Sequence, residues 1–282
     1  MRTFSGTGKA RGHFGELIQG YSNEFQSLIL VTLPCHLMDS TAHFQACWNS
    51  PLLVSGNWEK TLKATRVSLI KMQRKGWGGI MHIRCTAPVC GGAGSSTLCV
   101  LSALRAVHFC FGITVSAREE TDLCRSIEQA CDPLMFNNPE RIIWSPLEAK
   151  CYEVMPPLPD FIAVGGFDGL GCLTDSCDRV SPPIDDILTT LKRGVLKQCS
   201  YTIGEATTAS AELNQLYNPK PHWKDIITLA HDVGACGVCV AHTGSAVAML
   251  FTEEQEVAVY NAQKGLESLG IQPVCFRTPR SR

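Results

Sequence analysis

The stretch between Ile80 and Phe109 constrains the fold more than any other part of the chain. Ile80–Cys85 is rich in apolar and β-branched residues, which predicts a strand. Thr97–Phe109 is apolar nearly all round, and this is typical of a helix enclosed by a core. Between them, residues 88–97 read P-V-C-G-G-A-G-S-S-T, and the glycines let the backbone bend sharply. The sequence therefore predicts a strand, a glycine-rich loop and a buried helix in succession.

The glycine-rich loop is a candidate phosphate site. At the start of the predicted helix, backbone N–H groups have no intrahelical acceptor and the helix dipole is positive, so an anion is favoured there. The hydroxyls of Ser95 and Ser96 could also bind phosphate or ligate magnesium, which prefers oxygen donors. A simple turn capped by a serine is the alternative. The strand–loop–helix context favours the phosphate site, which would comprise Gly91, Gly92, Ala93, Gly94, Ser95, Ser96 and Thr97.

Two carboxylates follow the next predicted helix. Ser116 and Glu119 form a capping box that opens this helix, and Glu128 lies near its end. Asp132 comes four residues later, so the two carboxylates could face the same way, and Pro133 presents Asp132 just past the helix. Phosphoryl transfer to an alcohol needs a carboxylate near the hydroxyl and a magnesium ion on the phosphates. On these residues alone, an ordinary solvated pair at a helix end is the favoured alternative.

Further elements complete an α+β pattern, because strands and helices are mixed and do not alternate strictly. The C-terminal helix is expected to open at Thr252 and Gln255 in the same way as the capped helix. Met155–Pro159 (M-P-P-L-P) is extended and rigid, and marks a domain boundary. Besides those above, the remaining predicted elements are strands at Leu28–Leu33, Phe161–Val164, Gly237–Ala241, Ala246–Phe251 and Pro273–Phe276, and a helix at Lys60–Arg74.

Composition excludes several classes of protein. The 282 residues carry a net charge of −1 without a basic cluster, which argues against a nucleic-acid partner. No apolar run is long enough for a membrane span, and no signal peptide is present, so we expect no membrane partner. The 15 cysteines are scattered, as in a cytoplasmic protein with reduced thiols. A redox or zinc role for Cys236 and Cys239 is a weak alternative, since no second ligand pair accompanies them.

Four segments together resemble the GHMP kinases, a superfamily that includes galactokinase, homoserine kinase and mevalonate kinase. Residues 88–97 look like its central P-x-x-x-G-x-G/A-S-S motif. Residues 15–20 (G-E-L-I-Q-G), 128–136 (E-Q-A-C-D-P-L-M-F) and 240–251 (V-A-H-T-G-S-A-V-A-M-L-F) resemble segments of the L-threonine kinase branch, which serves cobalamin biosynthesis.

The match has departures. Gly92 stands where the central motif usually has Leu or Met. Residues 11–14 read R-G-H-F where the family usually has Pro-Ala-Ser, and His13 there is equally a substrate ligand or a structural residue. Residues 169–176 (G-L-G-C-L-T-D-S) differ from the G-x-V-D-T of the threonine kinases. The last departure concerns the choice of substrate, whereas fold and phosphoryl transfer do not depend on it.

The resemblance implies a two-lobed GHMP kinase fold with ATP at the junction: a ribosomal protein S5-like lobe over 1–155 and a ferredoxin-like lobe over 156–282. It also implies that Ser95, Ser96 and Glu128 hold magnesium, and that Asp132 orients the substrate hydroxyl or accepts its proton. The residues implied on the substrate side are Glu16, Gln19, His242, Thr243, Gly244 and Ser245.

The function implied is an ATP-dependent kinase that phosphorylates the hydroxyl of a small amino acid, L-threonine or a close analogue. One alternative is a GHMP kinase for another small alcohol, homoserine or a sugar. A second is a protein of this fold that binds a metabolite without turnover, and a third is a redox protein that uses the cysteine pair. The sequence leaves the substrate and a homodimer open.

Overall fold

The structure, a computed structural model, describes residues 3–55, 59–170 and 182–278. Its strands are β1 (Thr3–Ser22), β2 (Ser27–Trp48), β3 (Leu52–Val54), β4 (Trp77–Cys85), β5 (Ile142–Ser145), β6 (Lys150–Val154), β7 (Ile162–Phe167), β8 (Gly237–Val240), β9 (Ala246–Phe251) and β10 (Val274–Arg277). Its helices are α1 (Glu59–Lys71), α2 (Ser95–Cys110), α3 (Ala117–Ile127), the 3₁₀ turn η1 (Pro139–Arg141), α4 (Asp185–Leu196), α5 (Ser200–Asn214), α6 (Trp223–Asp232) and α7 (Glu256–Ser268).

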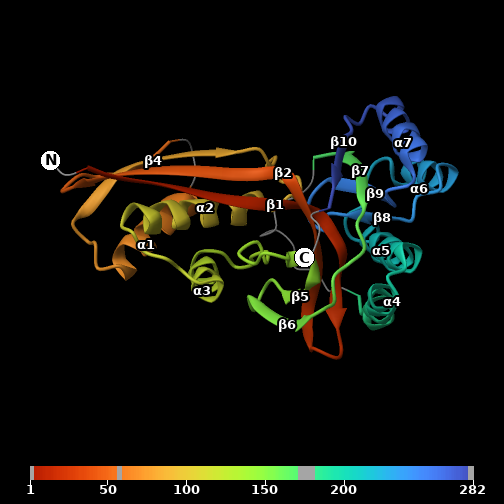
Figure 1. Ribbon diagram of the computed structural model, residues 1–282, viewed down its shortest axis with the longest axis horizontal. Helices are drawn as coiled ribbons and strands as arrows, with labels where there is room; N and C mark the ends of the chain where they lie inside the picture. Colours follow the sequence, from red (N-terminus) through yellow and green to blue (C-terminus); the bar gives the residue numbers. More distant parts are fainter. Residues whose placement is uncertain (1–2, 56–58, 171–181, 279–282) are drawn as a thin grey trace.

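One continuous sheet runs through the molecule in the order β10-β7-β9-β8-β1-β2-β4-β3, and β5 pairs with β2 and β6. β1 and β2 form a long antiparallel ribbon that extends from the N-terminal end past the strands of the C-terminal half (Figure 1). The C-terminal strands join this ribbon where Glu16 pairs with Val240. Residues of the two halves therefore meet along the middle of β1.

The buried helix α2 lies along β1 at very short range. A Cβ on Gly6 would lie 2.3 Å from the carbonyl oxygen of Ala106, and one on Gly8 would lie 2.1 Å from that of Ser102. Glycine is required at both positions because the helix backbone occupies the space of a side chain. This approach buries α2 in the main hydrophobic core and holds its N-terminus beside the central part of β1.

The chain divides its helices between the two halves. α1, α2 and α3 lie on one side of the β1–β2–β4 sheet, whereas α4, α5, α6 and α7 accompany the C-terminal strands (Figure 1). The face of the C-terminal sheet has its own cluster, in which Val164, Val238 and Met249 pack against Ile226 and Leu266. No helix within the described part of the chain has the length and hydropathy that a membrane crossing requires.

The α+β class predicted from the sequence is confirmed. All six predicted strands overlap observed ones, although β2 continues far beyond its predicted end, to Trp48, and β4 begins earlier than predicted, at Trp77. The predicted capping box at Ser116 and Glu119 is present. The predicted start of the last helix is wrong: α7 begins at Glu256 with Gln255 as its N-cap, and Thr252 lies outside it.

The sequence missed β1, β3, β5, β6 and three helices of the C-terminal half, α4, α5 and α6. In β1, the glycines that accommodate α2 interrupt the apolar alternation by which a strand is recognised. In α5, small and polar residues dominate, so the amphipathic period is weak.

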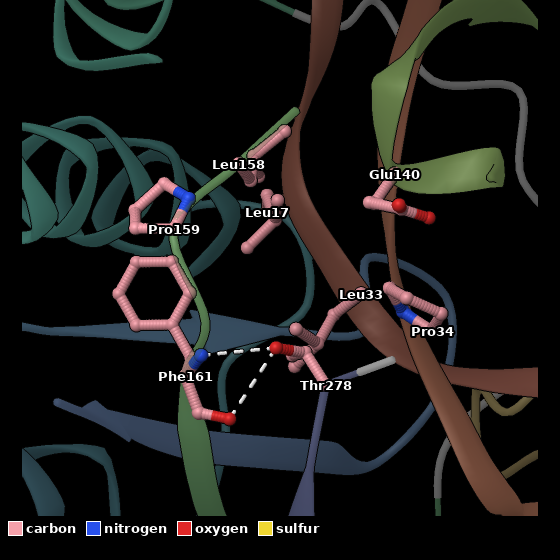
Figure 2. Close-up of a pocket in the computed structure, with 8 residues that line it drawn as sticks. All are labelled: Leu17, Leu33, Pro34, Glu140, Leu158, Pro159, Phe161 and Thr278. Carbon is pink, nitrogen blue, oxygen red and sulfur yellow. Dashed lines mark hydrogen bonds between the residues drawn. The ribbon is translucent and has the colours of Figure 1, made fainter. Parts of the chain in front are cut away.

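The segment between β6 and β7 carries no regular secondary structure. Figure 2 shows Leu158, Pro159 and Phe161 of this segment beside Leu17 and Leu33 of the β1–β2 ribbon. The Phe161 N–H donates to Thr278 Oγ1 at 2.9 Å, which ties the segment to the end of β10. The enclosed void measures about 10 Å³, room for about one water molecule. The division into domains near residue 155 stays a prediction.

Candidate active site

The glycine-rich loop leads directly into α2. Gly94 is the N-cap in the left-handed conformation (φ 71°), and Ser95 and Ser96 begin the helix, as the sequence predicted. The loop carbonyls turn to other strands: Gly91 O accepts from Ala246 N at 2.8 Å, and Gly92 O accepts from Gly15 N at 3.0 Å. The first N–H groups of α2 have no intrahelical acceptor. This polarity suits an anion, because the donors face outward and the acceptors are already bonded.

A cavity of about 550 Å³ opens beside this loop, which is the size of a typical small-molecule site. It collects residues from β1, α1, the loop, the end of α3 and the turn between β8 and β9. The predicted site residues that line it are Glu16, Gln19, Gly92, Gly94, Ser95, Ser96, Thr97, Glu128, Asp132, His242, Thr243 and Gly244. Gly91, Ala93 and Ser245 are buried and do not line it.

Glu128 is a buried carboxylate that accepts hydrogen bonds from two hydroxyl groups. It is 4% exposed. The hydroxyl of Ser96 donates to Glu128 Oε1, and that of Thr97 donates to Oε2 at 3.0 Å. Burial raises the pKa of Glu128, and the two hydroxyls oppose that rise. The carboxylate and hydroxyl oxygens beside the glycine-rich loop are hard ligands, so this group fits magnesium and does not fit a soft metal.

Lys60 adds a positive charge that the sequence analysis did not identify. From the first turn of α1, its Nζ donates to Ser96 Oγ at 3.0 Å and lies 3.5 Å from Glu128 Oε1. Its neighbour Thr61 also lines the cavity, and the buried Thr61 hydroxyl has no hydrogen-bond partner among the described residues. A lysine in the polar part of an amphipathic helix gives no sequence signal for such a role, since solvated lysines are common there.

Asp132 lies at the same end of α2 as Glu128. Its backbone N–H donates to Thr97 Oγ1 at 3.3 Å. The sequence predicted that Glu128 and Asp132 are neighbours because they lie one helical turn apart. This reason is wrong, because α3 ends at Ile127 and Glu128 is already extended (φ −113°, ψ 146°). They meet because Thr97 binds the side chain of one and the backbone of the other.

His13 and Glu16 converge because β1 is irregular between them. In a regular strand, residues three apart lie on opposite faces. Here the β1–β2 register shifts between His13 and Glu16, and Gly15 takes a φ of 74°. A side chain on Gly15 would also be blocked, since its Cβ would lie 2.8 Å from the backbone of Val240. The bulge therefore sends both side chains to the cavity, where His13 Nδ1 is 3.7 Å from Glu16 Oε1.

The turn between β8 and β9 forms the opposite wall. The His242 N–H donates to Glu16 Oε2 at 3.0 Å, while Asn214 and Asn218 each donate to His242 O at 3.1 Å. Gly244 packs on the glycine-rich loop, since a Cβ at this position would lie 2.1 Å from Gly92 N. Contacts to its backbone thus fix the turn on both sides, and the turn holds His242, Thr243 and Gly244 at the cavity.

The cysteine pair lies elsewhere. Cys236 and Cys239 are buried and free, and neither lines the cavity. Burial raises the pKa of both thiols, which keeps them protonated and poorly nucleophilic. These observations disfavour the redox alternative. The departure at residues 169–176 lies mostly outside the described residues.

Comparisons with known proteins agree with this architecture. Residues 191–264 match the sequence family "GHMP kinases C terminal". An L-threonine kinase of Citrobacter freundii is 33% identical over 70 residues, which are 25% of this chain and 24% of that protein. The matched segment therefore spans about a quarter of that curated relative.

Two solved structures share the fold over nearly their full length. Homoserine kinase from Cytophaga hutchinsonii superposes with a TM-score of 0.69 at 11% identity, covering 99% of this chain and 95% of that one. Mevalonate kinase of L. major, in complex with R-mevalonate, superposes with a TM-score of 0.69 at 14% identity, covering 100% and 97%. At these identities the similarity establishes the fold alone, so the chemistry has to be inferred from the residues of the site.

Proposed function

We propose that the chain is a member of the GHMP kinase superfamily and, on that premise, an ATP-dependent kinase that phosphorylates the hydroxyl of a small metabolite. One observation carries the proposal: Glu128, Ser96, Thr97 and Asp132 meet at the N-terminus of α2, beside a glycine loop and a cavity of metabolite size. Phosphoryl transfer depends on positioning and charge neutralisation, and this arrangement offers both.

Each side of the cavity has a proposed task. The N–H groups at the start of α2 and Lys60 bind the triphosphate, since both present positive charge to it. Glu128 with Ser95 and Ser96 would hold magnesium, which neutralises phosphate charge when bound. Asp132 orients the acceptor hydroxyl or accepts its proton. Glu16, Gln19 and the 242–244 turn bind the rest of the acceptor.

We propose L-threonine or a close analogue as the acceptor. Support comes from the similarity to the Citrobacter freundii L-threonine kinase and from the size of the cavity and its polar lining. Homoserine remains the main alternative, because it differs from threonine only in the position of its hydroxyl. Free cysteines throughout the described chain support a cytoplasmic location. A homodimer stays an untested prediction.

A coupled assay of ADP release tests the proposal. The purified chain is mixed with ATP, magnesium and one of threonine, serine, homoserine, mevalonate or galactose. We expect threonine to give the highest kcat/KM. If another alcohol gives the highest kcat/KM, the proposed substrate is wrong, whereas the proposed kinase activity stands. Tight ATP binding by calorimetry without ADP release for any hydroxylated metabolite would favour a binding protein without turnover.

Glu128→Gln tests the proposed magnesium site. The substitution keeps the size of the side chain and removes its charge, so a divalent cation loses one anionic ligand. We expect the magnesium concentration for half-maximal activity to rise about 10- to 100-fold. The matched control is Glu205→Gln, which makes the same change at an exposed position of α5. An unchanged magnesium dependence would remove Glu128 from the site.

A further inference from the structure

His13 lies under the phosphate loop, and the proposed function gives it no task. It is 2% exposed. A Cβ on Gly94 would lie 2.7 Å from its Cδ2, so the imidazole packs directly against the N-cap of α2. The side chain is therefore enclosed, in contact with the element that the proposal assigns to the triphosphate.

Both ring nitrogens of His13 face hydrogen-bond acceptors. Nδ1 is 3.1 Å from the carbonyl oxygen of Gly15, and Nε2 is 3.2 Å from Oδ2 of Asp132. A carbonyl oxygen carries no proton, so Nδ1 must be the donor in the first contact. In the second, two acceptor atoms can share a hydrogen bond only through a proton, and imidazole holds that proton because it is a stronger base than a carboxylate. Both nitrogens then carry hydrogen, which makes His13 an imidazolium.

The surroundings supply the charge that a buried imidazolium needs. Asp132 contacts one nitrogen, and Glu16 Oε1 lies 3.7 Å from the other. Burial works against the charge on His13, but the two carboxylates outweigh it and raise its pKa to about 9. The carboxyl of Glu16 is itself buried, and burial raises its pKa to about 7.

We propose that His13 is a positioning residue, protonated at neutral pH, that holds Asp132 as an oriented carboxylate. The imidazolium binds Oδ2 and leaves Oδ1 for the acceptor hydroxyl, so His13 has no lone pair with which to take the proton itself. The orientation of the hydroxyl rests on the proposed kinase function, whereas the charge state of His13 does not. A metal ion is the competing use of these ligands, since one atom each of His13, Glu16 and Asp132 lie within 4.8 Å of one another.

The structure favours the ion pair over the metal. His13 approaches Asp132 through Nε2 and Glu16 through Nδ1, on opposite sides of the ring. A single metal ion would bind one ring nitrogen of His13, and the other nitrogen would hydrogen bond to a carboxylate or a carbonyl. For Asp132 and Glu16 to bind the same ion, both would have to lie on the side of the ring that carries the metal-bound nitrogen.

Nitrogen-15 NMR of the full-length, histidine-labelled protein tests the charge state without reference to activity. The His13 signals are assigned by their loss in His13→Gln, with His108→Gln as the matched buried control on α2. We expect protons on both ring nitrogens at pH 7.5. Asp132→Asn should lower the titration midpoint of His13 by about one to two pH units. A neutral ring at pH 7.5, or displacement of a ring proton by equimolar Zn²⁺, would overturn the proposal.

Steady-state kinetics tests the positioning role. His13→Gln keeps one donor but loses the charge, so kcat should fall about 10- to 50-fold while the KM for ATP changes less than about twofold. His13→Lys should recover part of kcat, and His108→Gln should keep it. A wild-type kcat in folded His13→Gln would refute positioning. If the wild type phosphorylates no alcohol, the kinase proposal fails, and the NMR result still decides the charge state of His13.

Discussion

Asp132→Asn is expected to lower kcat about 1,000-fold and to change the Kd for ATP by less than about threefold. The amide keeps the shape of the side chain, and the backbone N–H of residue 132 can still donate to Thr97 Oγ1. What is lost is the negative charge that balances His13 and that, on the proposed function, faces the acceptor hydroxyl. Calorimetry with ATP and a coupled assay with the preferred alcohol measure the two quantities separately.

The matched control is Asp122→Asn, which makes the same change on the exposed face of α3. It should leave both kcat and the Kd for ATP at wild-type values. If Asp132→Asn keeps more than about a tenth of the wild-type kcat, Asp132 neither orients nor deprotonates the acceptor. The group that does so would then lie elsewhere in the cavity.

Gly244→Ala is expected to displace the glycine-rich loop that we propose binds the phosphates, although residue 244 lies far from this loop in the sequence. The new Cβ would lie 2.1 Å from Gly92 N and 2.3 Å from both Gly91 C and Gly92 Cα. These neighbours are backbone atoms, so the loop must shift as a whole. We expect the affinity for ATP to fall about 100-fold and the free energy of unfolding to fall by about 2 kcal/mol.

Calorimetry and urea denaturation measure the two effects of Gly244→Ala. The control is Gly112→Ala at the end of α2, where no atom lies within 4 Å of the new Cβ. Gly112 has a φ of 69°, so that variant experiences backbone strain alone, about 1 kcal/mol, and should bind ATP normally. Normal ATP binding by Gly244→Ala would mean that the phosphate loop does not depend on the β8–β9 turn.

Local sequence patterns predicted those parts of the site that depend on neighbouring residues. The glycines of 91–94 and the apolar residues of 97–109 lie next to each other in the chain, and they produce the loop and the buried helix by their own conformational preferences. The capping box at Ser116 is similarly local. Patterns of this kind can be recognised without knowledge of the partner elements.

Other parts of the site depend on contacts between distant segments. Lys60 reaches Ser96 and Glu128 because α1 packs beside α2, and an exposed helical lysine gives no sign of that contact. Asn214 and Asn218 hold His242 from across the C-terminal half. Such residues have ordinary local surroundings, so their roles appear only when the chain is folded.

The sequence by itself determined the α+β class and the glycine loop at the head of a buried helix, because each follows from local periodicity or motif. The carboxylates at 128 and 132 became candidates through the resemblance to a kinase segment. Only the tertiary structure decided that α3 ends before Glu128, and that the bulge at Gly15 turns His13 and Glu16 toward one cavity. The physical reason is that backbone irregularity in β1 is set by its contacts with α2 and β8, which lie far away in the sequence.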